Sequence, residues 1–251
     1  TQPLLRAEGV SDPPRLLSAD LELYPGEVVG VYGLEGHGQD ELLAGLAGSR
    51  HPVTGRLTVA GRQHAWGRPG RLIGAGVGFV PEDRKTEGLL LEESGRRNVT
   101  LPLLRRVSRF AVIQRRQERA LATEGAQAAG VRGNLASPAG ALSGGNQQKL
   151  ILGRWLAARS RVLLLNQPTR GVDVGSKEEI YKVIREQCEN GTAAVVVSRE
   201  ISELRGLCDR ILVMSHGRLV ADLSPESSEE QILAAAVGEE ISDDLLRMLF
   251  T

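Results

Sequence analysis

The stretch of sequence that decides the fold is Leu142–Lys149, which reads LSGGNQQK. It lies between a loop rich in proline and glycine and a segment with a helical pattern. Ser143, Gly144 and Gly145 at a helix start would leave backbone N–H groups accessible beside the positive end of the helix dipole. A phosphate oxygen is the natural ligand for such a site, although Ser-Gly-Gly alone is also common in linkers.

The whole octapeptide is far rarer, and it resembles the signature motif of ATP-binding cassette (ABC) proteins in the form typical of bacterial sugar importers. The runs EDRKTEGL at 82–89 and PTRGVDVG at 168–175 are similar to runs of the same family. The resemblance covers about residues 4–238 and indicates the C-terminal nucleotide-binding domain of a tandem ATPase subunit. A neighbouring branch that imports nucleosides often carries Gly-Gln at the P-loop end and Gln-Pro-Thr downstream, as this chain does, so the solute stays open.

Composition is that of an ordinary globular protein, with 41% apolar and 25% charged residues and a formal net charge of zero among 251 residues. A neutral chain has no bulk field to recruit nucleic acid. Cys188 and Cys208 have no metal or CxxC spacing, and we expect two buried thiols in a reducing cytosol. No apolar run approaches the ~20 residues of a membrane span. The start, Thr1-Gln2-Pro3, lacks a methionine and indicates a piece cut from a longer polypeptide.

The order of predicted elements gives an α/β fold class. Alternating or continuous apolar runs predict strands at 17–23, 27–32, 55–61, 77–80, 161–165, 193–198, 210–214 and 218–220. Helices are expected at 40–47, 176–189 and 200–207, and from the Ser224-Pro225 pair to about Val237. We expect a P-loop NTPase-like core with a mainly parallel sheet, a small antiparallel β subdomain and an inserted helical lobe at about 86–158. Residues 1–238 would form one nucleotide-binding domain, and 239–251 a short tail.

The segment 33–40 reads GLEGHGQD and stands where a phosphate-binding loop of pattern GxxxxGK[ST] belongs. Gly33, Gly36, His37 and Gly38 would let the backbone cradle phosphates; the glycines alone are more typical of a structural strand–helix turn, and the octapeptide downstream favours a degenerate P-loop. Gln39 replaces the lysine, and the loss of a charge-assisted bond of roughly 1.5–3 kcal/mol weakens nucleotide binding about ten- to a hundredfold. Asp40 replaces the Mg²⁺-binding hydroxyl and places a carboxylate where an anion should bind, although it could hold a metal ion.

The apolar run at 163–165 continues as NQPT, where ABC proteins carry Asp-Glu-Pro-Thr. Asn166 stands at the position that supports Mg²⁺, and Gln167 at that of the glutamate that polarises the attacking water. An amide is a very poor base, and a missing general base costs typically 10²–10⁴ in rate. Glu82 lies at the Q-loop position, and Arg199 at that of the switch histidine. The candidate metal ligands are therefore Asp40, Glu82 and Asn166.

Residues 96–119 are strongly basic: the only acid, Glu118, stands among Arg96, Arg97, Arg105, Arg106, Arg109, Arg115, Arg116 and Arg119. These arginines are expected either on solvated helix faces or toward an acidic partner or the headgroup side of a membrane. The resemblance implies contact with the transmembrane permease subunits.

In the family that the chain resembles, two such domains pack head to tail, and each ATP lies between one domain's P-loop and the other's signature. The resemblance therefore implies ATP and Mg²⁺ as cofactors and a second ABC ATPase domain as partner, in the same chain or another. It also implies permease subunits, an indirect solute-binding protein, and a peripheral location on the cytoplasmic face of the bacterial inner membrane. Ser143, Gly144, Gly145 and Gln147 would face the partner's ATP. The chain's own pocket would hydrolyse ATP poorly or not at all.

Two alternatives stay open. The chain could be a slow but active ATPase domain of a nucleoside importer, which calorimetry with ATP and Mg²⁺ would distinguish. It could instead belong to an ABC protein that acts on DNA, which the neutral charge and the lack of a long coiled-coil insertion disfavour.

Overall fold

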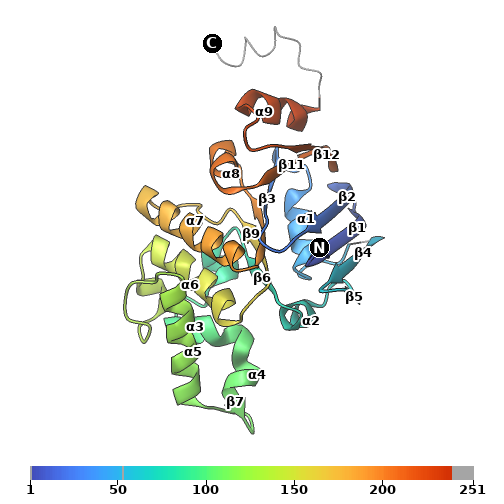
Figure 1. Ribbon diagram of the computed structural model, residues 1–251. Helices are drawn as coiled ribbons and strands as arrows, with labels where there is room; N and C mark the ends of the chain where they lie inside the picture. The colour runs from blue at the N-terminus through green and yellow to red at the C-terminus, as the bar shows by residue number, and fades with distance from the viewer. Residues whose placement is uncertain (1, 53, 239–251) are drawn as a thin grey trace.

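A computed structural model describes residues 2–52 and 54–238, so the predicted tail at 239–251 lies outside the described residues. The described chain forms a ten-stranded sheet in the order β5-β4-β1-β2-β12-β11-β3-β10-β9-β6 (Figure 1). Its strands are β1 (Leu5–Asp12), β2 (Leu16–Leu23), β3 (Val28–Gly33), β4 (Thr54–Val59), β5 (Arg62–His64), β6 (Val77–Val80), β9 (Val162–Asn166), β10 (Ala193–Val197), β11 (Arg210–Ser215) and β12 (Arg218–Leu223).

The sheet has a parallel and an antiparallel part. Strands β11, β3, β10, β9 and β6 run parallel, and β3, β9 and β10 are buried along their whole length. Continuous Val and Leu runs are typical of strands covered on both faces. Strands β1, β2, β4 and β5 pair antiparallel, and β2 alternates between buried and more exposed residues. The predicted mainly parallel sheet with a small antiparallel part is confirmed.

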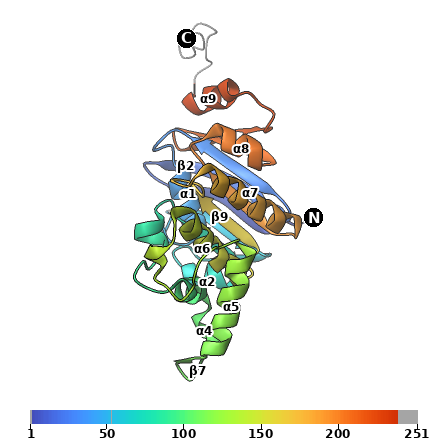
Figure 2. The same cartoon turned by 90° about the vertical axis from the view of Figure 1, so that its left-hand side faces the viewer.

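Helices cover both faces of the parallel strands (Figures 1 and 2). They are α1 (Gln39–Leu46), α2 (Pro69–Gly74), α7 (Val174–Glu189), α8 (Ile201–Leu207) and α9 (Glu229–Val237). The alternation of side chains along β9 divides the interior into two cores. Leu163 and Leu165 belong to the core beneath α7 and α8, whereas Val162 and Leu164 belong to the core that contains α1. This division places the start of α1 beside the carboxyl ends of the parallel strands.

A helical segment lies between β6 and β9 in the chain and projects from the sheet (Figure 2). It contains α3 (Gly95–Thr100), the 3₁₀ turn η2 (Leu101–Leu103), α4 (Leu104–Val107), the hairpin β7 (Ser108–Arg109) and β8 (Val112–Ile113), α5 (Arg115–Ala128), the 3₁₀ turn η3 (Ala139–Ala141) and α6 (Gly144–Ala157). We refer to residues 95–157 as the helical lobe. Helices α5 and α6 approach so closely that a Cβ added at Gly125 would lie 2.3 Å from the Gly153 carbonyl oxygen. The indole N–H of Trp155 donates to the Phe79 carbonyl at 2.7 Å and fastens α6 to β6.

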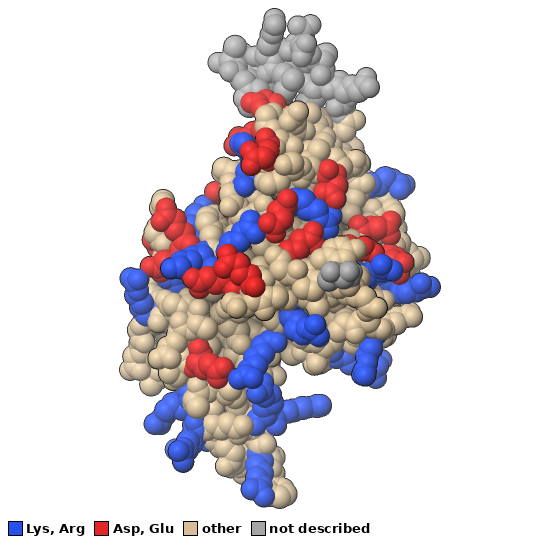
Figure 3. All heavy atoms as spheres, in the orientation of Figure 1, with Lys and Arg blue, Asp and Glu red and all other residues tan. Residues whose placement is uncertain are grey.

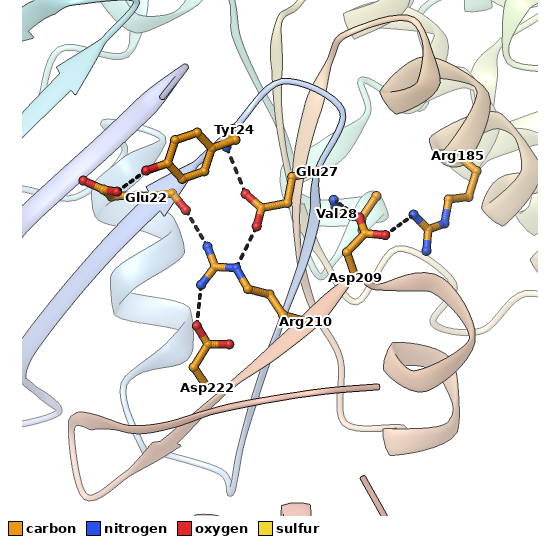
Figure 4. Close-up of polar contacts among 8 residues, drawn as sticks. All are labelled: Glu22, Tyr24, Glu27, Val28, Arg185, Asp209, Arg210 and Asp222. Carbon is orange, nitrogen blue, oxygen red and sulfur yellow. Dashed lines mark hydrogen bonds and ion pairs between the residues drawn. The ribbon is translucent and has the colours of Figure 1, made fainter. Parts of the chain in front are cut away.

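The amino end of β3, the strand that leads into the glycine-rich turn, is held by an ionic network that Figure 4 shows. The Arg210 guanidinium donates to Glu27 Oε1 at 2.7 Å, to Asp222 Oδ2 at 2.8 Å and to the Glu22 carbonyl at 2.7 Å. These bonds join the ends of β2, β3, β11 and β12, which are neighbours in the sheet. The strand that leads into the glycine-rich turn therefore has a fixed starting point.

One element prediction is wrong and others are missing. The helix expected from Ser224 begins at Glu229, because Ser228 is the actual N-cap: its Oγ accepts the Gln231 N–H at 3.2 Å, and its own N–H donates to Gln231 Oε1 at 2.9 Å. The sequence did not predict β1, β5, α2, the β7–β8 hairpin or the π-helix η1 (Arg84–Gly88). The domain limits at 238 and at 86–158 stay predictions. Among the described residues, no helix has both the length and the apolar character needed to cross a bilayer.

Candidate nucleotide site and signature face

The glycine-rich turn predicted at 33–40 connects the end of β3 to the start of α1. Gly36 and Gly38 have φ angles of 83° and 100°, in the left-handed region that favours glycine. A Cβ added at Gly38 would lie 2.4 Å from the Arg15 carbonyl oxygen, so only glycine fits this N-cap. The backbone therefore has the strand–turn–helix geometry in which N–H groups at a helix N-terminus bind an anion.

Gln39 follows this turn and points back into it. Its side chain is 4% exposed, and Nε2 donates to the carbonyls of Gly33 and Leu34 at 3.2 and 3.0 Å. Oε1 is buried and has no hydrogen-bond partner among the described residues. The side chain that replaces the expected lysine therefore binds the loop itself and brings no positive charge to it.

Asp40 and Asn166 are brought together although they are 126 positions apart in the chain. Asn166 Nδ2, at the end of β9, donates to Asp40 Oδ1 at 2.9 Å in the first turn of α1. Asn166 is 7% exposed, and its Oδ1 has no partner within the described chain. Two of the three candidate metal ligands are therefore in contact, and only one of the two, Asp40, is a carboxylate.

Gln167, which follows β9, lies next to Arg199, which follows β10. The Gln167 N–H donates to the Val197 carbonyl at 2.9 Å, and its Oε1 accepts the Arg199 N–H at 3.4 Å. Gln167 also has a φ of 49°, a backbone conformation that is uncommon outside glycine and concentrates at functional sites. In this chain the strained position carries an amide and not a carboxylate.

Glu82, the third candidate metal ligand, is engaged by two arginines. It accepts a hydrogen bond from Arg170, and its Oε1 lies 3.4 Å from Arg199 Nη2. The structure shows no contact of Glu82 with Asp40 or Asn166 among the described residues. The residues predicted at the Q-loop and switch positions thus form an ion pair, and Arg170 shares the same carboxylate.

The signature begins α6 as predicted. Ser143 is its exposed N-cap, and its Oγ accepts from Asn146 Nδ2 at 2.9 Å. A Cβ added at Gly145 would lie 2.4 Å from Ser176 Oγ, and one at Gly144 would lie 2.9 Å from an Arg84 nitrogen. A side chain at Gly145 would therefore collide with Ser176, whereas one at Gly144 would require the Arg84 side chain to move, and Ser143 stays accessible.

Gln147 differs from this accessible serine because it is buried. Its Oε1 accepts from Arg84 Nε at 3.3 Å, and its Nε2 donates to the Leu142 carbonyl at 3.0 Å. These contacts hold the signature loop from inside, and the predicted contact of Gln147 with nucleotide stays a prediction.

Arg84 is a residue that sequence reasoning missed as an individual. Besides Gln147, its guanidinium donates to the carbonyls of Arg170 and Gly171 at 2.7 and 3.3 Å. It therefore joins the loop after β6, the signature helix and the loop after β9. The only signal in the sequence was the charged run at 82–89, which does not tell which carbonyls an arginine will reach.

The backbone of this site fits phosphate better than its side chains do. The turn at 33–38 leads into the N-terminus of α1, where backbone N–H groups can bind an anion, but the side chains that follow it are a neutral amide and a carboxylate. Among the described residues, no group of three or more His, Cys, Asp or Glu side chains has the arrangement of a metal site. The oxygens of Asp40 and Asn166 are suitable ligands for a hard metal cation. The lysine that the P-loop pattern places against the phosphates is replaced by Gln39.

Comparison with known proteins agrees with this geometry. The family model described as ABC transporter matches residues 16–170. The chain is 40% identical over 243 residues to a putative ribose/galactose/methyl galactoside import ATP-binding protein of Agrobacterium fabrum, covering 94% of this chain and 48% of that protein. It is 41% identical over 240 residues to the ribose import ATP-binding protein RbsA of Corynebacterium glutamicum, covering 95% and 46%. The chain thus spans about half the length of the curated relatives it matches.

Solved structures show the same fold. The ATP-binding cassette MJ0796, a dimer in a post-hydrolysis state with ADP and Pi, matches with a TM-score of 0.76 and 22% identity over 89% of this chain and 100% of that one. A nucleotide-free cassette of an ABC transporter matches with a TM-score of 0.79 and 16% identity over 99% of both chains. The predicted P-loop ABC ATPase fold is confirmed, and this chain belongs to the ABC transporter family of ATP-binding proteins.

Proposed function

We propose that this chain is the nucleotide-binding domain of a bacterial ABC importer for simple sugars, and that it is an impaired half of an ATPase pair. Its relatives are named ribose or galactose import ATP-binding proteins, which supports the transport role and the solute class. Its signature would complete an ATP site held by a second ABC ATPase domain, in the same polypeptide or another. Its own P-loop and the strand end at Asn166 would contribute little to hydrolysis.

The observation that carries this proposal is the contrast between Gln39 and Ser143. Gln39 occupies the position of the P-loop lysine but is buried in the loop, where its Nε2 donates hydrogen bonds to two loop carbonyls. Ser143 stands exposed at the start of α6, at the positive end of the helix dipole. One face is therefore built to meet a phosphate, and the other lacks the positive charge to hold it.

ATP and Mg²⁺ are the cofactors of the ABC family, and this chain's own loop would hold them weakly. The amides of 33–38 would contact phosphate oxygens, and Asp40 with Asn166 would be the nearest oxygen ligands for Mg²⁺. Replacing a lysine–phosphate bond of roughly 1.5–3 kcal/mol by a neutral contact weakens binding about ten- to a hundredfold. Gln167 would orient a water through its amide but not deprotonate it.

The partners follow from the same proposal. Ser143, Gly144 and Gly145 would face the second ATPase domain, and the helical lobe would contact transmembrane permease subunits. A solute-binding protein outside the membrane would deliver the sugar indirectly. The chain would lie peripherally on the cytoplasmic face of the bacterial inner membrane.

Isothermal titration of the chain with Mg-ATP tests the impaired pocket. We expect weak binding, at least tenfold weaker than to a Gln39→Lys, Asp40→Ser double variant, and no measurable turnover. Tight binding with turnover that Gln167→Ala abolishes would contradict the proposal. It would favour a slow ATPase in its own right.

A further inference from the structure

The far end of the helical lobe carries an exposed apolar tip. Strands β7 and β8 pair through Ser108↔Ile113 and Arg109↔Val112, which leaves Phe110 and Ala111 as a two-residue turn. Figures 1 and 2 both show this hairpin at the end of the lobe remote from the sheet. Phe110 is 89% exposed and Val112 63% exposed. Large apolar side chains at the end of a protrusion have no core to stabilise.

The turn is also an unfavourable place for a bulky residue. Phe110 and Ala111 have φ angles of 49° and 62°. A two-residue turn with both φ angles positive strongly prefers Asn-Gly or Asp-Gly, because side chains are crowded in that conformation. The Phe110 ring has the Arg109 guanidinium 5.4 Å from its centroid, which does not shield it from water. Strain and exposure at one residue are typical of positions that serve function and not stability.

Positive charge surrounds the tip. Six arginines lie in 105–119, and all six are exposed: Arg105, Arg106, Arg109, Arg115, Arg116 and Arg119. None of them has an ion-pair partner among the described residues, whereas the only acid of the segment, Glu118, is buried and pairs with Arg96. Arg105 and Arg106 also line a hollow between α2 and α4 together with Arg68 and Arg71. Figure 3 shows this basic end of the molecule, with most acidic side chains gathered over the other half.

We propose that the β7–β8 hairpin is a membrane-contact tip, in which Phe110 and Val112 enter the interfacial region of an anionic lipid surface. The arginines behind the tip would reach the phosphate groups of the lipids while their aliphatic stems lie along the apolar boundary. The occupant is a lipid surface and not an acidic protein, because the apolar residues crown a convex protrusion. A protein partner would have to supply a pocket for Phe110, whereas lipid adapts to any convex shape.

The magnitudes make this contact measurable. Each arginine near an anionic surface contributes about a fivefold gain in partitioning. Burial of a phenylalanine side chain contributes roughly a further ten- to hundredfold. The attraction is screened by salt over about 8–10 Å. This contact does not depend on the proposed ATP site, since vesicles contain neither a partner ATPase domain nor a permease.

Insertion is tested with Phe110→Trp, whose emission is compared with that of the unmodified chain. With vesicles of phosphatidylcholine containing about 30% phosphatidylglycerol, we expect a blue shift and quenching by brominated lipid. Val220→Trp, at a half-exposed apolar position on β12, is the matched control and should show neither. An unchanged Phe110→Trp spectrum with bound vesicles would overturn the proposal, because it would mean adsorption without contact of the tip.

Charge is tested by cosedimentation with the same vesicles at low and high salt. We expect binding that pure phosphatidylcholine does not support, that falls about thirtyfold in Arg105→Gln, Arg106→Gln, and at least tenfold in Phe110→Ser. Arg62→Gln, Arg218→Gln removes two exposed arginines elsewhere and should bind as the unmodified chain does. Failure to bind anionic vesicles, equal loss in both double variants, or binding only to acidic polypeptides or nucleic acid would each overturn the proposal.

Discussion

Asn166→Asp would turn the bond between α1 and β9 into a repulsion. In the native chain Asn166 Nδ2 lies 2.9 Å from Asp40 Oδ1. Two carboxylates that relax to about 4 Å repel each other by about 4 kcal/mol at an effective dielectric constant near 20, which suits a partly exposed site. Some of this is relieved by water, so we expect the free energy of unfolding to fall by about 2–4 kcal/mol at pH 8.

The stability loss of Asn166→Asp should depend on pH and on Mg²⁺. The native-state pKa of the new carboxyl pair is raised, so the deficit is complete at high pH and shrinks as the pH falls and one carboxyl takes up a proton. Mg²⁺ should also reduce the difference in free energy of unfolding between the variant and the unmodified chain, because two carboxylates form a better site for a hard cation than a carboxylate with an amide. Urea unfolding of the variant and the unmodified chain at pH 8 and pH 5.5, with and without MgCl₂, measures all three effects.

Gln167→Glu is the matched control because it adds the same charge one residue later. The carboxylate introduced there would keep an acceptor for the Arg199 N–H, which now donates to Gln167 Oε1 at 3.4 Å. We expect the free energy of unfolding of this variant to change by less than about 1 kcal/mol, and Mg²⁺ to have no effect on it. If Asn166→Asp unfolds at the same urea concentration as the unmodified chain at pH 8, the two side chains do not touch and the reasoning fails.

Three further outcomes are expected. Burial raises the pKa of Cys188 to about 12 and that of Cys208 further, so at pH 8 roughly one Cys188 in ten thousand is a thiolate. A disulfide reagent should therefore react with neither thiol until urea is added. Fast labelling of the folded chain would contradict this burial. Gly125→Ala, which places a methyl group against the Gly153 carbonyl, should lower the free energy of unfolding by about 1–3 kcal/mol in urea titrations, and an unchanged midpoint would mean that α5 and α6 are not in close contact. Arg210→Met removes three hydrogen bonds from the ends of β2, β3 and β12 and should cost about 2 kcal/mol in the same titrations, with Arg218→Met as the exposed control; equal effects of the two would refute the role of the network.

Local pattern was enough for most of the fold. The alternation at 17–23 and the buried runs at 161–165 and 193–198 correspond to β2, β9 and β10, because period two and continuous apolar runs each have one strand environment that satisfies them. The helix start at Ser224 failed for the opposite reason. Ser224-Pro225 and Ser228 are both plausible caps, and the reciprocal bonds of Gln231 with Ser228 favour the second.

The short β7–β8 hairpin escaped prediction because its turn contradicts turn chemistry. Phe110 and Ala111 occupy positions where glycine or asparagine is the usual signal. A sequence rule based on favourable turns cannot find a turn that is strained. The same mismatch is what draws attention to the tip once the structure is known.

The candidate site was predicted in its parts but not in its connections. The sequence placed the glycine turn at 33–38 and the signature at 142–149, because each is a local motif. The ion pair of Glu82 with Arg199 and the three-way contact of Arg84 join residues far apart in the chain, and nothing local specifies them. Nor does the identity of Gln39 tell that its side chain folds onto the loop.

We propose above that the signature of this chain completes the ATP site of a partner domain, and that its own nucleotide pocket contributes little to hydrolysis. The most direct measurement is ATP hydrolysis by the transporter that contains this chain, assayed with Ser143→Arg and, separately, with Gln167→Ala. We expect Ser143→Arg to abolish hydrolysis, because a bulky cation would stand where the signature should contact the phosphate of the partner's ATP. We expect Gln167→Ala to leave the rate of hydrolysis within about twofold. Hydrolysis that survives Ser143→Arg and disappears with Gln167→Ala would contradict the proposal.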